Sequence, residues 1–69
     1  MDHSNSHRLR LTGKLIKGER RHLLECADEK VWRLNLLDVK IPKIGTHVII
    51  EGVQSGVDGI DVDWVGAKN

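Results

Sequence analysis

The chain has 69 residues, which suffices for one small domain and leaves little apolar material for a core. Cys26 is its only cysteine, so an intrachain disulfide is excluded, and a single free thiol is typical of a reducing compartment. Its 11 basic and 10 acidic side chains nearly cancel, unlike the strongly basic balance of a dedicated nucleic-acid-binding protein. Because the sequence contains no signal-like segment and no apolar run that could span a membrane, we expect a cytoplasmic protein without membrane contact.

Residues 1–7 are polar and without pattern, and we expect them to form a flexible N-terminal tail. From Arg8 onward apolar and polar residues alternate, which predicts a half-buried β-strand with Leu11 and Leu15 on its inner face. Gly13 lies in the middle of this strand and indicates a bend at which one strand serves two parts of a sheet.

Two further strands are predicted to follow, and with the first they form an antiparallel meander. The second covers roughly residues 22–27, and a tight reversal over residues 28–30 leads into the third. The third strand shows the clearest alternation in the chain, with Trp32, Leu34 and Leu36 directed inward.

The stretch over residues 37–46 breaks the alternation and contains a proline, so we expect a long connection with room for one short helical turn at most. A fourth strand is predicted over residues 48–52 and a glycine-bearing loop over residues 54–59. The fifth strand covers residues 60–64 and places Trp64 inward, in line with the apolar residues before it.

These elements predict an all-β fold, a small five-stranded antiparallel barrel of the OB type over residues 8–66, with a C-terminal tail over residues 67–69. An SH3-like barrel, which also has five short strands, is the alternative. In an OB-like order the fifth strand lies beside the third.

Several short motifs carry a resemblance to a known family. They are Thr12-Gly13-Lys14-Leu15, Trp32-Arg33-Leu34, Val48-Ile49-Ile50-Glu51-Gly52, and Ser55-Gly56-Val57-Asp58 followed by Asp61-Val62-Asp63-Trp64. Together they resemble a bacterial family of small proteins known only as a domain of unknown function, over about residues 9–66. The resemblance implies a compact, OB-like β-barrel of bacterial origin, and it implies no activity and no catalytic residues.

A nucleic-acid-binding face is the first candidate site, because OB-like barrels bind ligands across strands two and three and at the adjoining loops. The candidate residues there are Arg20, Arg21, Arg33 and Asn35. Single-strand binders also need exposed aromatic rings, whereas both tryptophans share the inward parity of their apolar neighbours. Weak binding of single-stranded nucleic acid is therefore the alternative function.

Three aspartates, Asp58, Asp61 and Asp63, form the second candidate site. The last two point the same way on one strand, so their oxygens could converge on a hard cation. Ion pairing with Arg33 on the neighbouring third strand is the competing interpretation. Because the spacing does not match a calcium loop, we assign no metal site and leave the cation open.

The sequence offers no paired nucleophile and base. Cys26 alternates with Leu24, which predicts a buried, inert thiol, and His22 lies roughly 13 Å away along the same strand. We therefore predict that the protein is not an enzyme and holds no cofactor.

Apolar side chains on the outward parity favour association, and a domain with a small core gains support from a partner. We expect a non-catalytic interaction module that docks on a protein partner or on itself. The residues predicted to form its surface are Leu23, Ile49, Ser55 and Asp58.

Overall fold

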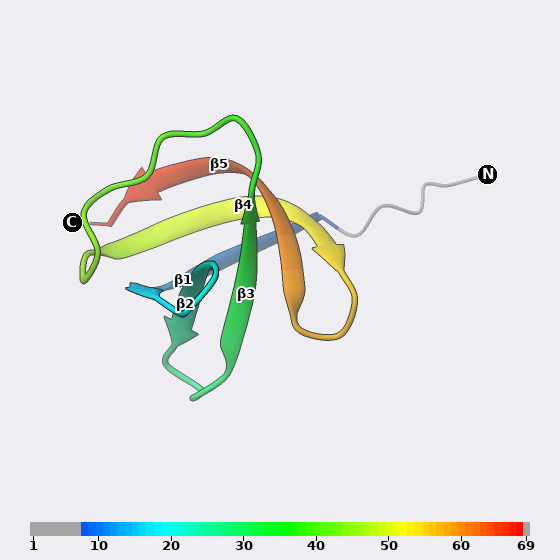
Figure 1. Cartoon of the computed structure of the whole chain (residues 1–69), viewed down its shortest axis with the longest axis horizontal. Coiled ribbons are helices and arrows are strands. Elements are labelled where there is room, and N and C mark those ends of the chain that lie inside the picture. The colour runs from blue at the N-terminus through cyan, green and yellow to red at the C-terminus, as the bar shows by residue number, and fades with distance from the viewer. Residues whose placement is uncertain (1–7, 69) are drawn as a thin grey trace.

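The computed structural model describes residues 8–68, and the tail predicted over residues 1–7 lies outside this range. The described chain forms strands joined by turns and one long connection (Figure 1). The strands are β1 (Arg8–Lys17), β2 (His22–Cys26), β3 (Val31–Leu36), β4 (His47–Ser55) and β5 (Gly59–Ala67). The last two strands are longer than predicted. β4 continues to Ser55, and β5 continues to Ala67, a residue that the sequence had assigned to the C-terminal tail.

The strands close into a barrel in the order β1-β2-β3-β5-β4, and β4 pairs back onto β1. The predicted all-β, five-stranded barrel is confirmed, and β5 lies beside β3 as an OB-like order requires. The prediction of a purely antiparallel barrel is wrong, because β3 and β5 run parallel. The reason is geometric: neighbouring strands in a closed ring can all alternate in direction only if their number is even.

The core is formed by the inward-facing residues of all five strands. Its fully buried side chains are Leu15, Leu24, Leu34, Val48, Ile50, Ile60 and Val62. Gly13 sits where β1 leaves β4 and continues along β2, with Cα partners on both strands. A β-carbon at this position would lie 2.5 Å from the carbonyl oxygen of Glu25, so the predicted bend requires a glycine.

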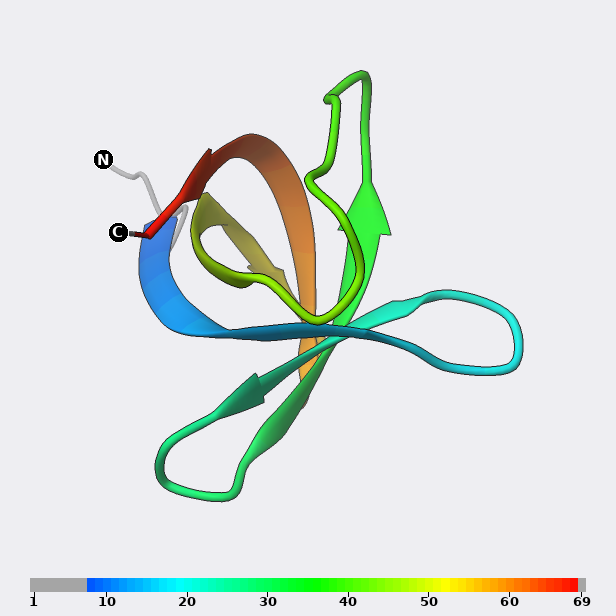
Figure 2. The ribbon, with the colours of Figure 1, turned by 90° about the vertical axis from the view of Figure 1, so that its left-hand side faces the viewer.

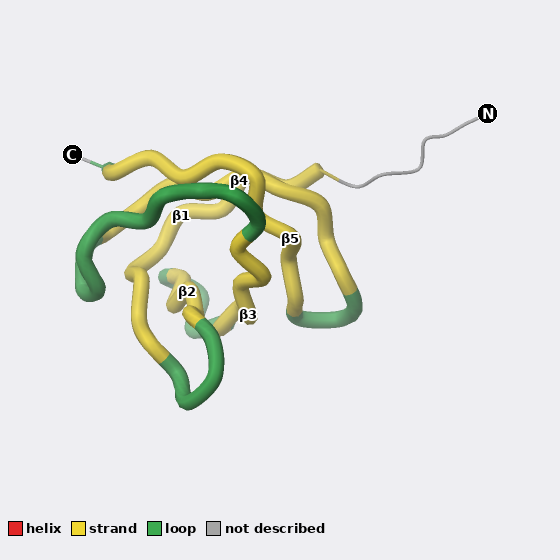
Figure 3. The backbone as a smooth tube through the Cα atoms, turned by 45° about the horizontal axis from the view of Figure 1, so that its top comes forward, coloured by secondary structure: helices red, strands yellow, loops and turns green. Residues whose placement is uncertain are grey.

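The connection between β3 and β4 arches over one end of the barrel (Figures 1 and 2). Val39 and Ile41 pack against the core from this connection, which covers the open end. No helix is present between residues 8 and 68, so the short helical turn allowed for in the connection is not formed (Figure 3). The described part of the chain accordingly has no helix of the length and hydropathy that a membrane span requires.

A β-bulge in β5 changes the outward face of the barrel. Glu51 pairs with Trp64 and Gly52 with Val62, so Asp63 is an extra residue without a partner on β4. An extra residue shifts the alternation by one, and Val65 therefore packs toward the core while Trp64 points outward with 46% of its surface exposed. The inward placement predicted for Trp64 is wrong for this reason.

Candidate functional site

A polar hollow of about 240 Å³ lies between the β1–β2 turn, β3 and the β4–β5 turn. The residues that line it include Arg21, Arg33, Asn35, Ser55, Gly59 and Asp61. We call this hollow, together with Val57 and Asp58 of the adjoining turn, the loop face. The loop face brings together residues that the sequence had assigned to two alternative sites. Arg21, Arg33 and Asn35 come from the nucleic-acid candidates, and Ser55 and Asp58 come from the protein-interaction candidates. Arg20, which is exposed, precedes Arg21 in the same turn.

Both turns of the loop face are held by hydrogen bonds. In the β1–β2 turn, the amide of Gly18 donates to the carbonyl of Arg21 at 2.9 Å. In the β4–β5 turn, Gln54 Nε2 donates to the carbonyl of Gly56 at 3.0 Å, and Gly56 has a φ of 77° that favours glycine. The side chains on these turns are therefore presented from fixed backbone positions.

On this face, two carboxylates form hydrogen bonds with the polar side chains of β3. Asp58 Oδ1 accepts a hydrogen bond from Arg33 Nε at 3.0 Å and lies 2.8 Å from Nη2 of the same guanidinium. Next to this pair, Asn35 Nδ2 donates to Asp61 Oδ1 at 2.9 Å. The sequence had paired Arg33 with Asp61 or Asp63, and this is corrected because the β4–β5 turn brings Asp58 over the start of the β3–β5 pairing. Little unpaired positive charge therefore remains on β3.

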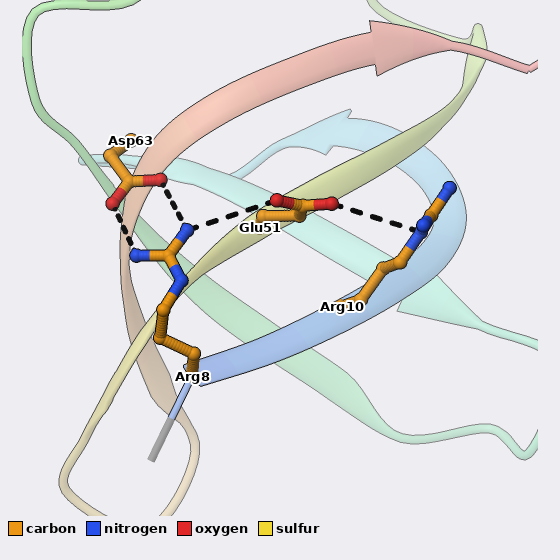
Figure 4. Close-up of polar contacts among 4 residues, drawn as sticks. All are labelled: Arg8, Arg10, Glu51 and Asp63. Carbon is orange, nitrogen blue, oxygen red and sulfur yellow. Dashed lines mark hydrogen bonds and ion pairs between the residues drawn. The ribbon is translucent and has the colours of Figure 1, made fainter. Parts of the chain in front are cut away.

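Asp63 lies on another side of the barrel, in a chain of ion pairs with β1 (Figure 4). Arg8 donates to both carboxylate oxygens of Asp63, at 2.7 and 3.0 Å, and its guanidinium also lies 3.8 Å from Glu51. Glu51 in turn lies 3.9 Å from Arg10. The hydrogen bond from Arg8 lowers the pKa of Asp63 below its ordinary value.

The three aspartates of the candidate cation site thus contact three different partners on two faces. Within residues 8–68, no group of three or more His, Cys, Asp or Glu side chains is arranged to hold a metal ion. Their arrangement fits ion pairing and hydrogen bonding in place of metal coordination.

Leu23 and Ile49, predicted to share one surface, are both half-buried and lie apart. Leu23 is opposite Arg33 on β3 and so borders the loop face. Ile49 is on β4, opposite Thr12 of β1 and Gly66 of β5, near Trp64. Leu23 pairs with Ile16 and Ile49 with Thr12, so the two positions lie on opposite sides of the bend at Gly13 in β1.

Neither tryptophan contributes a stacking ring to the loop face, and the chain has no Phe or Tyr. Trp32 packs against the core, with the Lys30 ammonium 4.7 Å from its ring centroid. Trp64 lies on the outside of β5, where its ring covers the α-carbon of Gly66.

A second hollow, of about 410 Å³, was not predicted from the sequence. It is lined in part by Lys14, Cys26, His47 and Lys68, which the bend in β1 gathers from three strands (β1, β2 and β4) and the C-terminal end. No hydrogen bond joins Cys26 to His47 in the described part of the chain, and burial together with the charge of Asp28 raises the pKa of the thiol. The half-buried Cys26 is therefore held as a neutral thiol, a poor nucleophile.

The fold and the loop face define a small closed β-barrel whose polar hollow lies between β3 and two turns. The chain belongs to the family described as Protein of unknown function (DUF5818), whose model matches residues 12–68. This range extends from the first half of β1 to the end of β5, and the predicted membership of a family known only as a domain of unknown function is confirmed. No curated protein and no solved structure matches the chain.

Proposed function

We propose that this protein is a non-catalytic docking module of the bacterial cytoplasm that binds a partner protein through its loop face. The proposal is carried by Val57, whose side chain is 82% exposed at the tip of a hydrogen-bonded turn beside the polar hollow. An apolar side chain presented on a held turn can enter a pocket of a partner with little loss of conformational freedom. The single free cysteine supports the reducing location.

The charges of the loop face support a partner with an acidic side chain next to its apolar pocket. Arg20 and Arg21 are exposed, and no ion pair joins either of them to a carboxylate within residues 8–68. Since Asp58 already neutralises Arg33, the positive charges of the loop face that a partner can pair with are those of Arg20 and Arg21 in the β1–β2 turn. A carboxylate of the partner would be attracted there and would orient the docked protein.

Site-specific photo-crosslinking tests this proposal. A photoreactive phenylalanine analogue replaces Val57, and the variant is expressed in the cells that naturally produce the protein. The matched control carries the analogue at Leu37, which is 52% exposed in the connection at the other end of the barrel (Figure 1). We expect one protein adduct from position 57 that is lost on Arg21→Glu and absent from position 37. Equal adducts from both positions, or none from position 57, would contradict the proposal.

Weak binding of single-stranded nucleic acid is a second candidate function. One observation favours it, since Arg21, Arg33 and Asn35 line the same hollow. The two carboxylates bound to β3 and the lack of a stacking ring on this face count against it. In an NMR titration with a mixed-sequence oligonucleotide, amide shifts around Arg20, Arg21 and Arg33 that fade as salt rises would favour this candidate over protein docking.

A further inference from the structure

The first half of β1 has one edge that no strand of the barrel covers. On its other edge, residues 8–14 pair with β4, whereas pairing with β2 begins only at Gly13 and continues to Lys17. β2 ends at Cys26, opposite Gly13, and the β2–β3 hairpin diverges from the first half of β1 (Figure 2). Residues 8–12 therefore have a paired strand on one side only, and we call their other side the free edge of β1.

The main-chain groups of Arg10 and Thr12 are directed toward the free edge. On the β4 side, Leu15 donates to the carbonyl of Thr46 at 2.9 Å and accepts from the amide of Gly45 at 2.7 Å. Hydrogen-bonding groups of successive residues in a strand point to alternate sides, so the odd-numbered residues of β1 bond toward β4 and the even-numbered ones toward β2. Within residues 8–68, neither Arg10 nor Thr12 has a main-chain partner on the β2 side.

The inward side chains of the first half of β1 also lack full cover. Leu9 and Leu11 pack against the core but are only half-buried, whereas Leu15, which has β2 beside it, is 1% exposed. The hollow of about 410 Å³ lies at the end of the free edge, beside Gly13 and Cys26. The free edge thus offers unpaired main-chain groups, apolar side chains and room for an added segment.

The strands that already flank β1 indicate which side chains fit beside it. On both sides, a glutamate lies opposite a cation of β1 and an apolar residue lies opposite a leucine. The glutamate pairs are Glu25 with Lys14 and Glu51 with Arg10, and the apolar pairs are Leu24 with Leu15 and Ile50 with Leu11. The Arg10 side chain is 67% exposed and lies 3.9 Å from Glu51, so donors of its guanidinium remain for a second carboxylate.

We infer that the free edge of β1 binds an extended segment of a partner protein as an added strand, antiparallel to β1 and in line with β2. The segment carries an acidic residue opposite Arg10 and apolar residues opposite Leu9 and Leu11. Main-chain hydrogen bonds supply the affinity and the alternating side chains supply the selectivity. A second copy of β1 fits less well, because the outward side chains of this strand are mostly cations.

The free edge is distinct from the loop face, since none of residues 8–12 lines the hollow of the loop face. The inference therefore does not depend on the function proposed for the loop face, and photo-crosslinking from position 57 reports separately on that function.

Amide hydrogen exchange tests the free edge in the unmodified chain. The amides of Arg10 and Thr12 should exchange at least about tenfold faster than those of Leu11 and Gly13, which bond toward β4. Slow exchange of Arg10 and Thr12 at every protein concentration would show that the edge is already covered and would overturn the inference. Slow exchange that develops only as the protein concentration rises would identify a second copy as the occupant and would overturn the partner segment.

A short peptide tests strand addition directly. The acetylated and amidated peptide Thr-Val-Glu-Val-Glu, antiparallel to β1, places its residues opposite Thr12 to Arg8 in turn. On titration to about 5 mM, we expect saturating NMR shifts and slower amide exchange at Arg10 and Thr12, with no shift at Val57. Absence of these changes would overturn the inference.

Two matched peptides separate strand addition from attraction between charges. N-methylation of the central glutamate keeps its charge and removes the N–H that donates to Arg10, so binding should weaken by at least about tenfold. A peptide with lysine in place of both glutamates should also bind at least about tenfold more weakly, because it sets cations beside the arginines of β1. Equal binding by all three peptides would contradict the proposed mode.

A proline on β1 tests the same hydrogen bonds from the side of the protein. Thr12→Pro removes an amide that faces the free edge, a position at which a strand tolerates proline, and the peptide should no longer bind. Thr12→Val keeps the amide and should bind the peptide as the native chain does. Undiminished binding by a folded Thr12→Pro variant would contradict strand addition, and if that variant does not fold, the N-methylated peptide decides the same point.

Discussion

The α-carbon of Gly52 lies against the backbone carbonyl of Asp61, so close that a β-carbon on Gly52 would overlap it. This contact occurs at the register shift between β4 and β5, where Gly52 pairs with Val62 and the next residue, Asp63, is the bulge. The bulge in turn places Trp64 on the outside and Val65 against the core. A glycine on one strand thus permits the change of face on the next.

Gly52→Ala should destabilise the barrel by at least about 2 kcal/mol, because the neighbouring strand has to move away from the new methyl group. Chemical denaturation measures this loss. Gly56→Asn is the matched control, since nothing lies within 4 Å of a β-carbon there and asparagine tolerates a positive φ. Its cost should stay below about 1 kcal/mol, and equal losses in both variants would contradict the close contact.

The two tryptophans should differ in their contribution to stability. Trp32→Ala removes a ring that packs against the core, and we expect a loss of at least about 2 kcal/mol. Trp64→Ala removes a ring that is 46% exposed, and the loss should stay below about 1 kcal/mol. The order would be reversed if Trp64 were the core residue.

The pair formed by Arg8 and Asp63 should make stability depend on acid pH. The hydrogen bond lowers the pKa of Asp63 in the folded state, so the folded protein favours the carboxylate. The pair therefore contributes to the stability of the fold at pH values above the ordinary carboxyl pKa of about 4. This contribution is lost as the pH falls through the lower pKa that Asp63 has in the folded state. Denaturation at a series of pH values should show a smaller acid loss in Asp63→Asn than in the native chain. An NMR titration that finds an ordinary pKa for Asp63 would contradict the contact.

Cys26 should react slowly with thiol reagents at neutral pH. Burial is the main cause that raises the pKa of this thiol, so the reactive thiolate forms only at pH values above the ordinary thiol pKa of about 8.5. The alkylation rate with iodoacetamide should be lower than that of a cysteine introduced by Ala67→Cys in a Cys26→Ala background, where the side chain is exposed. A faster rate at Cys26 would indicate an activated thiol and reopen the question of catalysis.

The alternation of the sequence predicted the five strands and most of the core, because Leu15, Leu24, Leu34, Val48, Ile50, Ile60 and Val62 all keep the inward parity. It did not predict the bulge, since one unpaired residue at Asp63 reverses the parity of everything after it. The alternation of inward and outward residues can be read from the sequence of one strand, whereas a bulge depends on how two strands pair.

The loop face was only partly predictable for a similar reason. Arg33 and Asn35 could be assigned to the surface from their outward parity, and Ser55 from its place in the predicted loop. The partners of Arg33 and Asn35 depend on the turn that joins β4 to β5. Asp58 reaches Arg33 across 25 residues of sequence, and the strand order alone had suggested Asp61 or Asp63. The second hollow was missed because it depends on the bend in β1.

The central claim is that Asp58 neutralises Arg33 on β3 and thereby leaves the loop face to a protein partner. It is tested most directly by fluorescence anisotropy of a labelled single-stranded oligonucleotide over a range of salt. The chains compared are the native chain, Asp58→Asn and, as control, Asp63→Asn, a residue that pairs with Arg8 away from the loop face. Asp58→Asn keeps the oxygen that accepts from Arg33 and removes only the charge. We predict no salt-dependent binding by the native chain or the control, and a gain in Asp58→Asn with a salt slope of about 0.7 per phosphate contact. Salt-dependent binding by the native chain, unchanged in Asp58→Asn, would contradict the claim and assign the loop face to nucleic acid.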